Sequence, residues 1–159
     1  APMLIAGDGA EPVVQWMNGQ GFVTKYLGPR PGSASSVKML RSVILKGIEA
    51  LAVESFVAAE RQGILKEVMA CLSDVDAKTF SATLAMLTQT HLVHAERRWE
   101  EMGLVAQTLR ETGVDPLMTT AIEKSHRRTV DARIAPADGK VPPLEEALRL
   151  LSEKVVRGR

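Results

Sequence analysis

Two hydrophobic patterns divide this chain. In the first 28 residues, Met3–Ala6 and Phe22–Leu27 are short apolar runs, and glycines follow both. Each run is typical of a buried strand that closes on a turn, and Glu11–Asn18 between them predicts a short helix. This order is that of the end of an α/β unit.

From Ser33 the pattern takes a helical period. Apolar residues recur at steps of three to five, as on the buried face of a helix. The recurring residues are Val37, Leu40, Ile44, Ile48, Leu51 and Phe56. The pattern continues to Gly63, a residue type that commonly follows the last helical turn. Roughly 30 residues at ~1.5 Å each predict a helix about 45 Å long. We expect it to be the central helix of an all-α domain or a helix shared at a dimer interface.

Further helices are predicted after Gly63. Their expected spans are Ile64–Leu72, a helix capped by Asp74 or Asp76 that runs to Met102 or on to Thr112, a helix from the cap at Asp115-Pro116 to Ile134, and Leu144–Val156. A loop over 135–143 separates the last two. The chain is therefore predicted to be mainly α. Residues 1–30 would be the end of an α/β domain, and residues 31–159 an all-α domain.

Composition supports helices and excludes several classes of function. Aromatic residues make up only 4% of the chain, which favours helices over a sandwich or barrel. A net charge of +1 gives no electrostatic case for nucleic acid or an anionic membrane surface. No apolar run reaches the ~20 residues of a membrane span, and no signal peptide is present.

The single cysteine, Cys71, fits a reducing cytoplasm, and its apolar neighbours predict a small buried side chain. The chain opens on Ala1-Pro2 directly before an apolar run. We therefore expect it to be a piece of a longer polypeptide.

Lys38 is the leading candidate for chemistry. It follows the glycine- and serine-rich turn 28–36 and stands in the first turns of the long helix, where the helix dipole favours anions. At about 100° per residue, one strip of this helix carries Ser35, Lys38, Arg41, Ser42 and Glu49. One interpretation is a partly solvated helix start with scattered charges. The other is a lysine aimed into a cleft, where a desolvated lysine can act as general acid or base.

A second polar stretch carries His94, Arg97 and Arg98. His91 and His94 are three residues apart, but no further ligand is near in sequence, so no metal site is predicted. The default interpretation is a solvated helix face with ion pairs. The alternative is an anion-binding patch, because arginine forks suit carboxylate and phosphate. The segment His126-Arg127-Arg128 is interpreted as plain surface, and the GxGxxG and GxxxxGK(S/T) fingerprints are both absent.

The spacing of Lys38, Glu54 and Gly63 resembles that of a known family. It is similar to the β-hydroxyacid dehydrogenases, relatives of 3-hydroxyisobutyrate dehydrogenase and 6-phosphogluconate dehydrogenase. In that family a glycine-rich segment precedes a catalytic lysine on the long first helix of an all-α C-terminal domain. The segments 34–39 and 94–98 look like those of a subfamily with a DUF1932 C-terminal domain.

This resemblance implies a 6-phosphogluconate dehydrogenase C-terminal-like helical domain, preceded by the last strands of a Rossmann domain. It implies hydride transfer between NAD or NADP and a small hydroxy acid or related polar substrate, with the cofactor held mainly by an N-terminal domain outside this chain. Lys38 would be the general acid or base. The residues expected at the substrate are Ser35, Ser42, His94, Arg97 and Arg98. A homodimer through the helical domain is also implied.

Three positions depart from the family pattern. The two asparagines usual after the lysine fall on Arg41 and Ser42, and Glu100 stands where the family commonly has a lysine that holds a substrate carboxylate. Ser42 can donate one hydrogen bond, and Arg97 and His94 are the expected replacements for the lysine. These departures keep open a non-catalytic helical dimerisation module that retains only the fold. A DNA-binding helical domain is disfavoured by the charge of +1.

Overall fold

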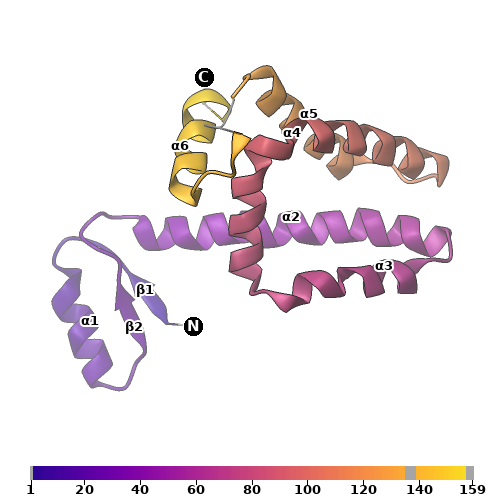
Figure 1. Cartoon of the computed structure of the whole chain (residues 1–159). Coiled ribbons are helices and arrows are strands. Elements are labelled where there is room, and N and C mark those ends of the chain that lie inside the picture. Colours follow the sequence, from indigo (N-terminus) through magenta and orange to yellow (C-terminus); the bar gives the residue numbers. More distant parts are fainter. Residues whose placement is uncertain (1, 135–138, 157–159) are drawn as a thin grey trace. The chain divides into compact units, whose positions relative to one another are not determined.

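A computed structural model describes residues 2–134 and 139–156. The elements in chain order are β1 (Met3–Ile5), α1 (Ala10–Gly19), β2 (Thr24–Tyr26), α2 (Ser33–Arg61), α3 (Leu65–Cys71), the 3₁₀-helix η1 (Leu72–Ala77), α4 (Phe80–Glu111), α5 (Leu117–Asp131) and α6 (Leu144–Lys154) (Figure 1). The described chain is mainly helical, as the sequence predicts. It forms two compact units, Ala1–Glu49 and Ala50–Arg159, and the division falls inside α2.

The first unit contains the predicted α/β element. β1 pairs with β2 in parallel, with Met3 opposite Thr24 and Ile5 opposite Tyr26. Parallel neighbours need a crossover connection, which α1 provides here. The side chain of Asn18 fastens α1 to β2, because its Oδ1 accepts the backbone N–H of Thr24 at 2.9 Å. Both strands are shorter than predicted.

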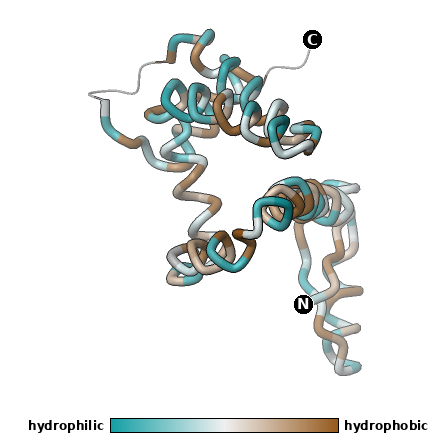
Figure 2. Tube along the Cα trace, turned by 90° about the vertical axis from the view of Figure 1, so that its right-hand side faces the viewer, coloured by the Kyte–Doolittle hydropathy of each residue, from teal (hydrophilic) through white to brown (hydrophobic). Residues whose placement is uncertain are grey.

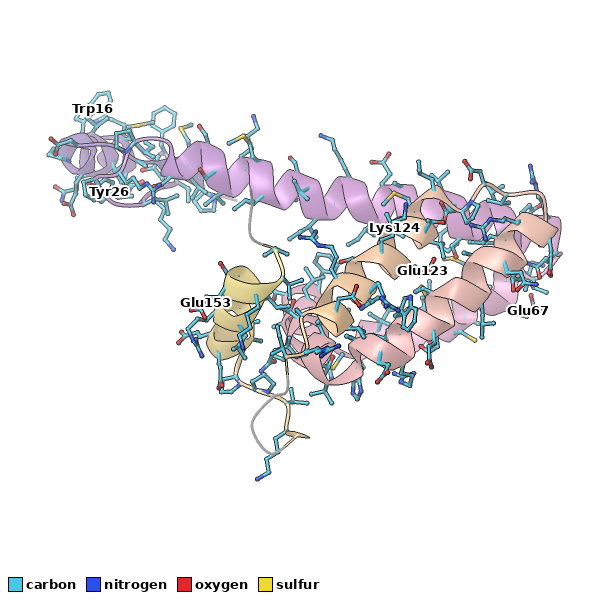
Figure 3. The ribbon with its side chains drawn as sticks, turned by 90° about the horizontal axis from the view of Figure 1, so that it is seen from above. Trp16, Tyr26, Glu67, Glu123, Lys124 and Glu153 are labelled. Atoms are coloured by element: carbon cyan, nitrogen blue, oxygen red, sulfur yellow. The ribbon has the colours of Figure 1, made fainter. Side chains whose placement is uncertain are left out.

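The outer side of α1 is exposed. Trp16 is 64% exposed and extends outward from the helix, whereas Val14 is buried. Tyr26 lies on β2, and its hydroxyl donates to the Gly7 carbonyl at 3.3 Å (Figure 3). The small core of this unit therefore lies between α1 and the two strands.

α2 ends where the sequence predicts. Gly63 has a φ of +71°, and its N–H donates to the Glu60 carbonyl at 3.0 Å. The N–H of Ile64 donates to the Ala59 carbonyl at 2.9 Å. This pair of bonds is the usual left-handed cap of a helix, and glycine adopts that conformation without steric cost.

The predicted buried face of α2 is wrong over its first half. Leu40 is 66% exposed, and Val37, Ile44 and Ile48 are exposed as well. Apolar residues also lie off the predicted face, and one of them, Val43, is 70% exposed. Hydrophobic and hydrophilic residues are interspersed along the trace in Figure 2. The residues of α2 that are buried are Glu54, Ala58 and Ala59.

The second unit is built on α4, which packs against α5 and α6 (Figure 1). Its buried apolar residues are Ala58, Ala59, Leu92, Ala95, Ala106, Leu109 and Ala147. Alanines predominate, and their small side chains let helices approach closely. The guanidinium of Arg127 on α5 lies 4.4 Å from the ring centroid of Trp99 on α4, a cation–π contact that adds to this packing.

Two local predictions before α4 are wrong. Thr79 caps α4, because its hydroxyl accepts the N–H of Ala82 at 3.3 Å, and the expected caps Asp74 and Asp76 fall within η1 instead. Cys71 is exposed rather than buried, since it ends a short helix that has no buried residue. In the predicted loop 135–143, residues 135–138 lie outside the described residues.

Candidate functional site

Lys38 lies on an open cavity of about 560 Å³ at the start of α2. The cavity is lined by Ser35, Lys38, Met39, Ser42, Val43 and Lys46. Three residues proposed from helical spacing, Ser35, Lys38 and Ser42, thus share one surface, whereas Arg41 does not line it. All the described lining residues belong to α2, so the cavity is an open hollow along one side of this helix, here called its wall.

The charge on this wall is positive. Lys38 is exposed, and it belongs to none of the salt bridges found among the described residues. Lys46, two turns later, lines the same cavity, and the first turn of α2 contains no acidic residue. Sequence reasoning missed Lys46, although its spacing of eight residues from Lys38 signals a shared helix face.

The structure separates the three residues of the predicted anion patch. Arg97 pairs with Glu101 on the surface, at one turn along α4. Arg98 is half-buried and donates to the Thr90 hydroxyl at 3.0 Å. His94 is half-buried and lines neither of the cavities described here. The sequence therefore predicts the helix that carries these three residues, but the structure does not bring them into one patch.

Arg98 instead lies beside two histidines from different helices. His91 on α4 and His126 on α5 stack, with ring centroids 4.7 Å apart and planes inclined by 26°. Nε2 of His91 is 2.7 Å from the Thr129 hydroxyl. His126 was predicted to be plain surface, but it is half-buried because α5 packs its ring against α4. Sequence alone offers no signal for this pair, which lies on separate helices.

Burial keeps both histidines neutral. Desolvation, with His126 and Arg98 nearby, lowers the pKa of His91 to about 4. Desolvation and Arg98 also lower the pKa of His126. The pKa of Arg98 is lowered by burial and by Arg97, although an arginine keeps its charge throughout the physiological range. At neutral pH this cluster thus carries one cation beside two neutral rings.

Acidification is expected to destabilise the protein through His91. Between pH 6.5 and about 4 the unfolded chain binds a proton that folded His91 does not. The contribution of neutral His91 is therefore complete above pH 6.5 and is lost as the pH falls toward 4. After discounting for solvent screening, we expect a loss on the order of 2 kcal/mol.

Urea unfolding at several pH values measures this loss. His91→Gln should flatten the dependence of unfolding free energy on pH between 6.5 and 4.5, and His94→Gln on the same helix should keep the wild-type slope. A wild-type slope in the His91→Gln protein would contradict the assignment.

Glu54 has a structural position. It is buried, and its carboxylate accepts the N–H groups of Met118 at 2.7 Å and Thr119 at 2.9 Å, as well as the Thr119 hydroxyl. These N–H groups belong to the first turn of α5, where a helix lacks internal acceptors and favours negative charge. Burial raises the pKa of Glu54, but the three hydrogen bonds outweigh it and lower the pKa overall. The predicted cap, Asp115, is replaced by a residue from another helix.

Arg61 makes the matching contact at the end of α4. Its Nη1 donates to the carbonyl of Thr112 at 3.1 Å and to that of Gly113. Gly113 has a φ of +74°, and a Cβ there would stand 3.1 Å from the Arg61 guanidinium. The final turns of α2 therefore contact both sides of the turn 112–116. The Arg61 cation binds the end of α4, and the Glu54 anion binds the start of α5.

The described residues contain neither a metal-ligand cluster nor a membrane-spanning helix. Over residues 2–134 and 139–156, no three histidine, cysteine or acidic side chains come together in a way that could hold a metal ion. No helix in the same part of the chain is both long enough and apolar enough to cross a bilayer.

Comparison with known proteins places the chain among uncharacterised relatives. It is 28% identical over 98 residues to the "Uncharacterized 28.5 kDa protein in 7S RNA 5'region" of Methanothermus fervidus, covering 62% of this chain and 39% of that protein. The crystal structure of a conserved hypothetical protein from Sinorhizobium meliloti 1021 shares 27% identity and a TM-score of 0.43, over 95% of this chain and 51% of that one. The chain thus spans about half or less of each relative. Residues 59–129 match the family described as "Domain of unknown function (DUF1932)".

Proposed function

We propose that this chain is the C-terminal part of an NAD(P)-dependent oxidoreductase acting on a small hydroxy acid or related polar substrate. The proposal includes a helical domain of the 6-phosphogluconate dehydrogenase C-terminal type and a cytoplasmic location. Its main support is the exposed Lys38, which lines an open cavity with Ser35 and Ser42 and has no salt bridge among the described residues.

Lys38 would act at the substrate oxygen. As an ammonium group it would donate a proton to a carbonyl oxygen during reduction, and as an amine it would accept the hydroxyl proton during oxidation. The hydroxyls of Ser35 and Ser42, on the same wall, would hydrogen-bond the substrate and fix its position. Lys46 would attract a substrate carboxylate to this wall.

In this proposal the described residues do not hold the dinucleotide. The N–H of Gly7, at the end of β1, is already bonded to the Gly28 carbonyl at 3.1 Å. Glu11 stands in the first turn of α1, where its charge would repel a phosphate. In this proposal the NAD or NADP is held by a domain outside this chain, and Lys38 serves the substrate alone.

The proposal is tested on a full-length protein that contains this chain. A panel of small hydroxy acids and their keto forms is screened with NAD and NADP at the nicotinamide absorbance. Turnover that depends on Lys38 would support the oxidoreductase. Turnover that stays the same when Lys38 is replaced would show that the reaction does not depend on this site.

We further propose that the protein is a homodimer in which α2 is covered by the second copy. The support is the exposure of apolar residues around the first half of this helix, such as Leu40 at 66% and Val43 at 70%. Val43→Asp is expected to halve the mass measured by sedimentation equilibrium, because a buried unpaired charge is costly at an interface. Lys25→Asp, at an exposed position of β2, should leave the mass unchanged. A monomeric wild-type protein would contradict the dimer.

The alternative function is a non-catalytic dimerisation module. The same exposed apolar helix favours it, because dimerisation needs no contribution from Lys38. A dimer that gives no turnover with any substrate and either nucleotide would support the module over the enzyme.

A further inference from the structure

A second cavity lies between α4 and α5 and has no role in the proposed reaction. Its volume is about 340 Å³, a size that suits a small molecule. It is lined by Leu84, Leu87, Thr88, His91, Arg98 and His126. The lining is apolar toward the start of α4 and polar toward the stacked histidines.

Arg98 is the cation of this cavity, and it makes no salt bridge among the described residues, although the charge of Glu101 is near it. Its one hydrogen bond goes to a neutral group, the Thr90 hydroxyl. The nearby Glu101 is paired with Arg97. Glu123, labelled on α5 in Figure 3, approaches α4 at Gly103, and its carboxylate makes no salt bridge with Arg98. A guanidinium drawn partly out of water favours an anionic partner.

His126 lines the cavity, but its Nδ1 does not face it. Its Nδ1 is shielded from solvent and has no hydrogen-bond partner among the described residues. An atom without exposed surface cannot contact a molecule in the open cavity, so His126 lines the cavity with other atoms of its ring. Because burial lowers the pKa of both histidines, an anion entering at neutral pH would meet one fixed cation and two neutral rings.

We propose that this cavity binds a small organic carboxylate. The carboxylate would lie against the Arg98 guanidinium, beside the stacked rings of His91 and His126. The aliphatic part would lie along Leu84 and Leu87. This site is independent of Lys38 and of the oxidoreductase proposal.

The test uses hexanoate and acetate as probes, because they share the carboxylate and differ only in the aliphatic chain. The chain has three histidines, so the ring proton signals of His91, His94 and His126 can be assigned by single substitutions. Hexanoate is expected to shift the signals of His91 and His126 saturably while leaving that of His94 in place. It should bind at least about tenfold more tightly than acetate, since each buried methylene adds to affinity.

Two pairs of variants separate the parts of the site. Arg98→Gln should weaken hexanoate binding at least about tenfold, whereas Arg97→Gln, with the same change in charge next to it, should stay within about twofold. Leu87→Ser, at a 44% exposed position that tolerates a polar residue, should remove most of the preference for hexanoate over acetate. Leu104→Ser, at a 69% exposed position of the same helix, should not.

Several outcomes would overturn the proposal. One is the absence of hexanoate-dependent shifts at His91 and His126. Others are equal binding by wild type and a folded Arg98→Gln protein, and equal affinity for hexanoate and acetate. A shift confined to His94 would place the binding elsewhere and would also overturn it.

Discussion

Replacing Lys38 by alanine is expected to lower kcat of the full-length enzyme by about 10²–10⁴-fold, the usual contribution of a general acid or base. The reason is that Lys38 is the exposed ammonium that shares its cavity with Ser35 and Ser42. Removing it deletes the proton donor but leaves the hydroxyls in place. The affinity for NAD or NADP should stay close to that of the wild type, because the proposed dinucleotide site lies outside this chain.

Lys46→Ala is the matched control, since Lys46 belongs to the same helix and lines the same cavity. Its loss should raise KM for an anionic substrate more than it lowers kcat, because it would contribute binding rather than proton transfer. Lys38→Arg should remain slow, since arginine keeps its proton at working pH. An unchanged kcat for Lys38→Ala on a confirmed substrate would refute the catalytic role.

Replacing Glu54 by alanine is expected to lower the free energy of unfolding by about 3 kcal/mol or more. The substitution removes a buried carboxylate and leaves the N–H groups of Met118 and Thr119, with the Thr119 hydroxyl, without their acceptor. Hydrogen bonds to a charged group are worth more than neutral ones, and the start of α5 would lose its only capping side chain in the described structure. Urea unfolding of the wild type and the variant measures the loss.

Glu60→Gln is the control, because Glu60 lies on the same helix but is exposed, and it should change stability by less than about 0.5 kcal/mol. The dependence on pH gives a second measurement. Since the pKa of folded Glu54 is lowered below its ordinary value of 4.5, its contribution is present above that value and is lost as the pH falls through the folded pKa. Glu54→Gln should lack this loss. A Glu54→Ala protein as stable as the Glu60→Gln protein would contradict the capping role.

The fold was predictable where the signal is local. The run after Ser33, the glycine at position 63 and the two apolar runs near the N-terminus each specify their element within a few residues. The buried face of α2 was not predictable, because an apolar face shows only that residues suit burial, and over the first half of the helix nothing in the described structure covers that face. The cap of α5 was missed for a different reason. The local candidate Asp115 competes with Glu54, which is far away in sequence but buried against the same turn.

The candidate sites also differ in whether their residues come from one helix or from two. Ser35, Lys38 and Ser42 line one cavity because a single helix sets their spacing, whereas Arg41 and Glu49 of the same predicted strip do not line it. The predicted grouping of His94 with Arg97 and Arg98 did not include His126, which shares a cavity with Arg98 but belongs to another helix. A single sequence does not show which faces of two helices pack against each other.

Arg61 and Glu54 of α2 both contact the turn 112–116 or the helix ends beside it. These contacts affect where the chain can be cut to make a shorter fragment. The match to DUF1932 begins at residue 59, so a fragment cut at that boundary would keep Arg61 and lose Glu54. Such a fragment would retain the helices α3 to α5 almost whole, yet its α5 would begin on unsatisfied backbone donors. A fragment that keeps both contacts therefore has to start before Glu54, as the second compact unit does at Ala50, rather than at the start of the DUF1932 match.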